Sequence, residues 1–232
     1  MYHVVAAPPP GALFPDLYVH PADFAAQIDW LRRHGFRAVT LRDLYDYWHG
    51  KTSLPSCPIV LSFDDGYRSV YTHALPVLRK LGWPGVLNLV VANLRRPWGL
   101  SPPMVSALLA LGWELDSHSL THRDLTLVDP RQLVQEVAAS RTRLRQRFGV
   151  PVDFFSYPLG HYNAAVVAAV RKAGYLGATT IDPGLAVPRE LFLLRRVRVS
   201  ATDGVAGLAA KLERLRACPG ARGGGPGRGS GA

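Results

Sequence analysis

Two adjacent carboxylates, Asp64 and Asp65, follow an apolar run of the sequence. The run covers residues 58–63 and is typical of a buried strand in a parallel sheet, and Gly66 then permits a sharp turn. Taken alone, the pattern is explained by one Asp that caps a helix beginning near Tyr67. A carboxylate at the end of a buried strand is costly unless it is paired, however, so a chemical role has to be considered.

Two histidines later in the chain could complete a metal site with one of these carboxylates. His118 and His122 follow a short strand expected at residues 113–116, and their i, i+4 spacing places both imidazoles on one face if the segment turns helically. A histidine pair on a loop means little by itself. One Asp and two His, however, supply an oxygen and two nitrogens and leave positions open on a divalent ion. The combination predicts a metal site.

Three motifs, taken in order, carry a resemblance to a known family. They are FDDG at residues 63–66, HSLTH at 118–122 and FFSYPLG at 154–160. From residue 1 to about residue 199 the chain resembles the polysaccharide deacetylases of carbohydrate esterase family 4, also called NodB homology domains. The Tyr-Pro-x-Gly form of the third motif is similar to the branch that deacetylates poly-N-acetylglucosamine in biofilm matrix. The resemblance implies an α/β fold, a distorted and incomplete (β/α) barrel.

The resemblance also implies roles for the first two motifs. Asp64 matches the general base that takes a proton from the attacking water, and Asp65 matches a metal ligand. His118 and His122 match the other two ligands. An ion held in this way polarises an amide carbonyl and lowers the pKa of its bound water towards ~7. We expect a divalent metal, with zinc as the first choice.

The third motif is expected to bind the substrate and its developing oxyanion, for which one donor is typically worth ~3 kcal/mol. By the resemblance, the oxyanion donor is the backbone N–H of Leu159. The residues assigned to this role are Ser156, Tyr157, Pro158, Leu159 and Gly160. Many family members carry an Arg in this motif that orients the base, and this chain does not. Arg195 or Arg196 could orient Asp64 instead.

The leaving amine needs an acid, and histidine is the natural one. The usual family pattern, a Leu-x-His near the C-terminus, is absent from residues 193–197. In the poly-N-acetylglucosamine branch a Tyr-His on the first strand fills this role, and Tyr2 and His3 match it. His3 is therefore the expected acid, and the alternative is a buried histidine bonded to the backbone. His161 is the second choice.

The elements that must position these residues alternate between strand and helix. Alternation favours a parallel sheet covered by helices, with functional residues at the carboxyl ends of strands, although it does not separate an open sheet from a barrel. Strands are expected at residues 1–6, 37–41, 58–63, 86–91, 113–116, 152–157 and 176–180, and helices at 21–34, 41–48, 68–81, 103–111, 130–148, 163–173 and 205–217.

Length and composition favour one domain. A chain of 232 residues with 48% hydrophobic content can bury one α/β core, which we place at residues 1–217. Residues 218–232 are expected to be a disordered Gly- and Arg-rich tail. The two cysteines, Cys57 and Cys218, define no disulfide framework. The net charge of +10 is attributed to solvated basic faces, and no nucleic-acid partner is expected.

These observations predict a metal-dependent hydrolase that removes N-acetyl groups from a polysaccharide containing N-acetylglucosamine, with a metal-bound water as nucleophile. Two alternatives stay open: a catalytically degenerate carbohydrate-binding or accessory module, and a deacylase of a non-sugar amide. The family implies a place outside the cell or at its envelope, acting on cell wall or biofilm. Neither a signal peptide nor a membrane span is evident, so a cytoplasmic location also stays open. The oligomeric state is not predicted.

Overall fold

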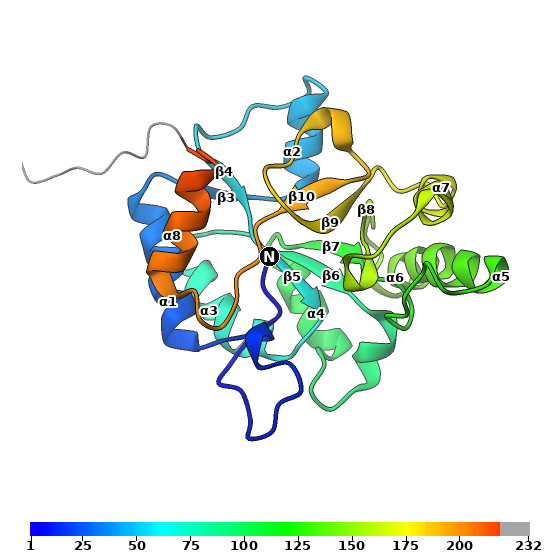
Figure 1. The fold of residues 1–232 in the computed structure, drawn as a ribbon, viewed down its shortest axis with the longest axis horizontal. Coiled ribbons are helices and arrows are strands. Elements are labelled where there is room, and N and C mark those ends of the chain that lie inside the picture. The colour runs from blue at the N-terminus through cyan, green and yellow to red at the C-terminus, as the bar shows by residue number, and fades with distance from the viewer. Residues whose placement is uncertain (219–232) are drawn as a thin grey trace, which may run out of the picture.

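A curled sheet of parallel strands forms the centre of the computed structural model, which describes residues 1–218 (Figure 1). Six strands pair in the order β10-β9-β8-β7-β6-β5 and make a half-barrel, as the family resemblance implied. The strands are β5 (Ser62–Asp65), β6 (Val86–Leu89), β7 (Glu114–Ser117), β8 (Phe154–Ser156), β9 (Gly177–Pro183) and β10 (Leu194–Arg196). Two parallel pairs stand beside this sheet, and they are β1 (Val4–Val5) with β2 (Tyr18–Val19) and β3 (Arg37–Val39) with β4 (Pro58–Val60).

Helices surround the sheet in Figure 1. They are α1 (Pro21–Arg33), α2 (Leu41–Trp48), α3 (Leu75–Arg79), α4 (Pro102–Ala110), α5 (Pro130–Val134), α6 (Ser140–Phe148), α7 (Ala164–Lys172) and α8 (Gly204–Arg214). Two π-helical segments, η2 (Val70–Ala74) and η4 (Gln135–Ala139), run directly into α3 and α6. Asp129 caps the stretch that begins with α5, and Gly149 ends α6 with a left-handed φ of 68°, as expected from the sequence.

Strand register places the polar residues of the centre on one face. Asp64 pairs with Asn88, and Asn88 pairs with Asp116, across β5, β6 and β7. Register partners in neighbouring strands point to the same face, and that face is the inside of the curl. Two residues earlier in β6, Val86 also points inside, where it packs with Leu41 of α2. The interior therefore has an apolar floor closed by α2 and a polar layer at the carboxyl ends of the strands.

The expected strand at 58–63 is wrong in one respect, because the chain changes partners within it. Residues up to Val60 pair with β3, whereas from Ser62 onward the chain pairs with β6. The apolar run is unbroken because both halves are covered, so hydrophobicity gives no sign of the change. The strand β10 was not expected at all. It is short and its register shifts between Leu194 and Arg196, which leaves too little alternation to recognise.

The two cysteines form a disulfide that joins distant parts of the chain. Cys57 immediately precedes β4, and Cys218 follows α8, with Cα atoms 5.5 Å apart. Of residues 218–232, the predicted disordered tail, Cys218 forms this disulfide and residues 219–232 lie outside the described residues, so the domain limit at residue 217 stays a prediction. Among the described helices, none combines the length and the apolar character needed to cross a bilayer.

Candidate active site

Three side chains converge at the carboxyl ends of β5 and β7. The Nε2 atoms of His118 and His122 are 3.2 Å apart, and Asp65 Oδ1 lies 3.7 Å from the former and 3.4 Å from the latter. Ligand atoms bound tetrahedrally at about 2.0–2.1 Å from one ion lie roughly 3.3 Å from each other. The three predicted ligands therefore fit a divalent metal ion, and they form the metal-ligand group of this site.

The protonation of the histidines also fits metal binding. His118 Nδ1 lies 2.7 Å from the carbonyl oxygen of Ser156, and because that oxygen can only accept, Nδ1 carries the proton and Nε2 keeps a free lone pair. Burial lowers the pKa of His118 to about 3 and also lowers that of His122, so both rings are neutral at neutral pH. Burial, and then the charge of Asp64, raise the pKa of Asp65 to about 7. A bound cation would oppose that rise.

The histidine segment does not turn helically, so the condition under which the i, i+4 spacing would put both rings on one helix face is not met. Ser119 and His122 have left-handed backbones, with φ of 69° and 62°. The hydroxyl of Ser119 accepts the backbone N–H of His122 at 3.0 Å, which closes a tight loop. The two rings are therefore brought together by a loop rather than by one face of a helix.

Asp64, the expected base, is buried and held by two donors. Arg196 donates from Nη1 to Oδ1 at 2.8 Å and from Nη2 to Oδ2 at 2.9 Å, and Asn88 Nδ2 donates to Oδ1 at 2.7 Å. Burial alone would raise the pKa of Asp64, but Arg196, followed by His118 and His3, holds it well below its usual range. The carboxylate is therefore ionised at neutral pH.

Of the two arginines considered for this role, the structure brings only Arg196 to Asp64. Arg195 is 52% exposed and lies 3.5 Å from Glu190. Arg196 is buried, and its other N–H groups donate to the Ser62 and Ser156 hydroxyls and to the Thr180 carbonyl. A guanidinium with all its donors used is fixed in orientation, and it fixes the carboxylate in turn.

His3 lies on the same side of the chain as Asp64. Tyr2 donates its N–H to Ser62 and accepts that of Asp64, which adds the N-terminal segment to the edge of β5. The Tyr2 ring stacks on Phe63 at 5.7 Å, so the next residue, His3, faces the interior with Asp64. Its Nδ1 is buried and has no hydrogen-bond partner within residues 1–218. The alternative was a histidine bonded to the backbone, and within the described part of the chain His3 Nδ1 makes no such bond.

The third motif divides into a buried part and a rim. Its serine, Ser156, accepts a hydrogen bond from Arg196 through its hydroxyl and one from His118 through its backbone carbonyl, and so links the partner of Asp64 to the metal-ligand group. Tyr157 is buried and donates its hydroxyl to a backbone carbonyl. Leu159 has a left-handed φ of 59° and an exposed side chain. His161, the second candidate acid, is exposed, and its Nδ1 lies 2.7 Å from Asp124.

Sequence reasoning missed Asn88. It is the single amide in an otherwise apolar strand, and it is 1% exposed. A buried amide needs partners, and that was the available signal. The sequence could not show that Asp64 is the partner of Asn88, because their contact depends on the register of β5 against β6.

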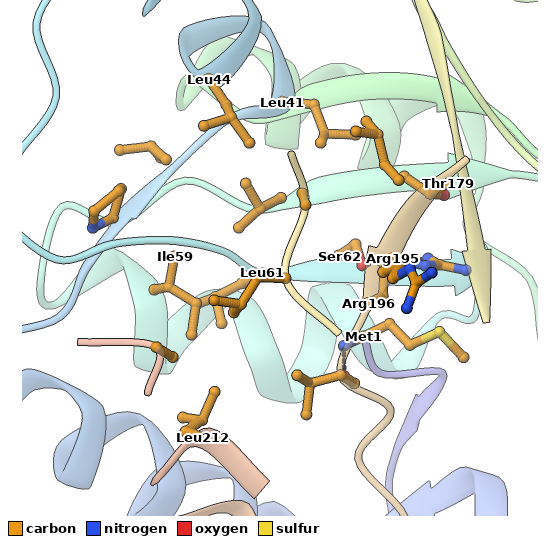
Figure 2. A pocket seen from close by; sticks show the side chains of 18 of the residues that line it. Met1, Leu41, Leu44, Ile59, Leu61, Ser62, Thr179, Arg195, Arg196 and Leu212 are labelled. Carbon is orange, nitrogen blue, oxygen red and sulfur yellow. Dashed lines mark hydrogen bonds between the residues drawn. The ribbon is translucent and has the colours of Figure 1, made fainter. Parts of the chain in front are cut away.

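A cavity of about 280 Å³ is lined in part by Ser62 and Arg196, two residues that neighbour Asp64 (Figure 2). It lies between β10 on one side and β4 with the start of β5 on the other, beside the open side of the half-barrel. Figure 2 shows Ser62 and Arg196 together on one side of this space and Ile59 and Leu212 on another. None of the three metal-ligand residues lines it. The cavity therefore borders Arg196 and is not part of the metal site.

Comparison with known proteins gives a consistent result. The family model for polysaccharide deacetylase matches residues 51–178. A Bacillus subtilis (strain 168) protein assigned to the polysaccharide deacetylases, YxkH, is 28% identical over 202 residues, which is 86% of this chain and 72% of that protein. The poly-beta-1,6-N-acetyl-D-glucosamine N-deacetylase of Escherichia coli (strain K12) is 25% identical over 217 residues, or 75% of this chain. The match spans only 32% of the E. coli protein.

Among solved structures, a polysaccharide deacetylase from Bacillus cereus is similar in sequence and in fold. It is 30% identical, with a TM-score of 0.80, over 91% of this chain and 67% of that one.

Proposed function

The chain belongs to the polysaccharide deacetylase family, and from that premise we propose that it removes N-acetyl groups from a polysaccharide containing N-acetylglucosamine. The observation that carries the proposal is the placement of Asp64 beside the group Asp65, His118 and His122. A carboxylate held by Arg196 and Asn88 lies next to three ligand atoms at metal-binding distances. Amide hydrolysis needs this combination of a base and an electrophile.

The proposed ligands are Asp65, His118 and His122, and zinc is the first choice because one oxygen and two nitrogens suit it. When bound, the ion would polarise the amide carbonyl and make water a better nucleophile. Asp64 then accepts the proton of the attacking water, and Arg196 keeps both of its oxygens in place. The backbone N–H of Leu159 is the proposed donor to the oxyanion.

His3 is the proposed acid for the leaving nitrogen. Burial lowers its pKa to about 4, an effect that the charge of Asp64 partly opposes. At neutral pH the ring is therefore uncharged before reaction, so the proton that it gives to the leaving nitrogen is the one that Asp64 takes from the attacking water. Water supplies the hydroxyl group of acetate and the proton of the free amine, so atoms and charge balance.

An aromatic pair beside the site supports a sugar substrate. Trp98 stacks on Tyr67 with ring centroids 4.8 Å apart and stays 43% exposed. Tyr67 follows the proposed ligand Asp65 by two residues, and burial, followed by the charge of Asp65, raises its pKa to about 12. Exposed aromatic faces next to a polar site suit the apolar face of a sugar ring.

Acetate release tests the proposal. Protein loaded with Zn²⁺, chelated protein and an Asp64→Asn variant are each incubated with β-1,6-linked and β-1,4-linked N-acetylglucosamine oligomers and with peptidoglycan. We expect release that requires the metal and is lost in Asp64→Asn. The β-1,6-linked oligomers come first because the E. coli relative is named for that polymer. We propose that the enzyme meets its polymer at the cell envelope or outside the cell, in wall or biofilm.

Two other results would redirect the proposal. Binding of Zn²⁺ and of the oligomers without acetate release would favour a carbohydrate-binding or accessory module. Release of an acyl group from simple amides, but from no sugar in the panel, would favour a deacylase of a non-sugar amide. Acetate release that persists fully after chelation would contradict the proposed role of the metal.

A further inference from the structure

One buried carboxylate outside the three motifs holds the loop that carries the histidines. Glu136 lies in the π-helical segment η4 and is only 6% exposed. Its Oε2 accepts the backbone N–H groups of Leu120 and Thr121, both at 2.9 Å. Its Oε1 accepts the hydroxyl of Thr121 at 2.5 Å. Three donors from one short loop therefore converge on one side chain.

That loop needs an external support because its backbone is strained. Ser119 and His122 are both left-handed, a conformation that costs roughly 1–2 kcal/mol per non-glycine residue. Between them, the carbonyl of Leu120 accepts the N–H of Ala92 at 2.9 Å, whereas its own N–H points to Glu136. The loop is thus held through its carbonyls by the segment after β6 and through its N–H groups by Glu136.

The two histidines depend on this support to different degrees. His118 continues β7, donates its N–H to Leu89 and binds Ser156 through its ring, so it is fixed without Glu136. His122 lies at the far end of the strained loop, and its side chain is 30% exposed. Loss of Glu136 would therefore release His122 and leave His118 in place.

We propose that Glu136 is a positioning residue that sets His122 at bonding distance from a metal ion shared with Asp65 and His118. The inference rests on the proposed metal site. The π-helical segment is part of the arrangement, because a π turn inserts an extra residue into a helix and redirects the side chains that follow it, and such turns are frequent at functional sites.

Zn²⁺ affinity measured by competition with a chromophoric chelator tests this proposal. Glu136→Gln keeps the size of the side chain but replaces one acceptor oxygen by a donor, and we expect Zn²⁺ binding about 10- to 100-fold weaker, as for other residues that orient metal ligands. The matched control is Glu213→Gln, an exposed position on α8, which makes the same change of charge and should bind as wild type does.

A double-mutant cycle identifies the residue through which Glu136 acts. If it acts through His122, adding Glu136→Gln to His122→Ala will weaken Zn²⁺ binding no further than His122→Ala alone. The absorption spectrum of bound Co²⁺ should change in Glu136→Gln as it does in His122→Ala, an effect that a general loss of stability would not produce. Should Glu136→Gln fail to fold, Thr121→Val, which deletes only the hydroxyl bond, is expected to weaken binding roughly fivefold.

Each outcome separates this inference from the proposed function. Wild-type protein that binds neither Zn²⁺ nor Co²⁺ would overturn the metal site and the role of Glu136 together. Wild-type binding with unchanged affinity in Glu136→Gln, or in Thr121→Val if that is the variant that folds, would overturn the role of Glu136 alone. Fully additive losses in the double variant would also overturn it, because Glu136 would then act elsewhere.

Discussion

At the scale of single residues, the buried pair of Asp64 and Arg196 sets the charge and the orientation of the proposed base, Asp64. A buried ion pair costs several kcal/mol in desolvation per ion, and removal of one partner leaves an uncompensated charge. Here Asn88, Ser62 and Ser156 supply the additional bonds that such a pair needs. The pair therefore keeps Asp64 ionised and oriented, at the cost of making it a weak base.

Replacement of Arg196 by Lys should lower kcat and leave Zn²⁺ affinity unchanged. An ammonium cannot bind both carboxylate oxygens in parallel, so Asp64 loses its orientation and activity falls roughly 10- to 100-fold. Steady-state kinetics that separate kcat from KM, together with Zn²⁺ titration, make the measurement. Arg195→Lys is the matched control, since Arg195 lies on the outside. Equal losses in the two variants would contradict the positioning role of Arg196.

His3 should make the metal-free protein less stable in acid. Burial depresses its pKa from 6.5 in the unfolded chain to about 4 in the folded protein, so between these values the unfolded chain binds the proton more readily. The neutral, buried His3 ring therefore costs the folded protein no stability above pH 6.5, and the free energy of unfolding falls as the pH drops from 6.5 towards 4. His118 and His122, whose pKa values burial also lowers, add to the same trend.

Urea unfolding of chelated protein at pH 7.5 and pH 5 measures this contribution. His3→Gln cannot titrate, so the drop in unfolding free energy between the two pH values should be about 2 kcal/mol smaller than in wild type. His73→Gln, at an exposed histidine, is the control and should leave the drop unchanged. An unaltered drop in His3→Gln would mean that the His3 ring is solvated in the folded protein.

At the scale of elements, the residues of the metal-ligand group depend on how strands end. Asp65 is the last residue of β5 and has a left-handed φ of 71°, and Gly66 continues with φ of 82°. Two successive left-handed residues turn the chain sharply away from the sheet. The carboxylate of Asp65 therefore faces the loop after β7 instead of following the strand direction.

Gly66→Ala should disturb that turn in two ways. A Cβ at this position would lie 2.1 Å from Leu89 Cδ1, a side chain packed in the core, and the left-handed backbone adds strain. We expect a loss of about 2–4 kcal/mol in unfolding free energy and weaker Zn²⁺ binding, because Asp65 is displaced. Chemical denaturation and Zn²⁺ titration are the measurements.

Gly112→Ala separates backbone strain from the clash. Gly112 has nearly the same φ, 83°, but a Cβ there would meet no atom within 4 Å. This variant should lose only about 1 kcal/mol and bind Zn²⁺ normally. If both variants bind Zn²⁺ equally well, contact with Leu89 does not control the placement of Asp65.

At the scale of the whole molecule, the open side of the half-barrel is covered by parts of the chain from both ends. The N-terminal segment, α2 and α8 line the cavity between β4 and β10, and Ala217 lies on its edge. The disulfide between Cys57 and Cys218 joins the start of β4 to the end of this cover. It therefore ties the closing elements to the side of the barrel that supports Arg196.

Removal of this disulfide should destabilise the protein without changing any residue of the candidate active site. The bond joins residues 161 positions apart, and the chain-entropy model assigns up to about 5 kcal/mol to a loop of this size. The Tm should fall on addition of reductant, whereas a variant with both Cys57→Ser and Cys218→Ser should have a low Tm that reductant does not change. A wild-type Tm indifferent to reductant would contradict a stabilising role. Such a bond persists in oxidising surroundings, which agrees with the proposed action at the envelope or outside the cell.

The sequence by itself determined the class of fold and indicated which residues would form the candidate site. Adjacent carboxylates after an apolar strand, paired histidines and a third motif pointed to one family, and strand and helix alternation pointed to a parallel sheet. These signals are local or depend on fixed spacing, so they survive in the linear chain. The proposed ligands Asp65, His118 and His122 lie together as that reasoning expected.

Only the tertiary structure decided which distant residues support them. Successive side chains of β10 point to opposite faces of the sheet, so a change of one residue moves a side chain from the inside to the outside. The register shift in β10 and this alternation bring Arg196, rather than Arg195, to Asp64. Asn88 reaches Asp64 through strand register, and Glu136 reaches the histidine loop from a helix later in the chain. Such contacts depend on how strands align and how a helix packs, and local sequence patterns do not encode either.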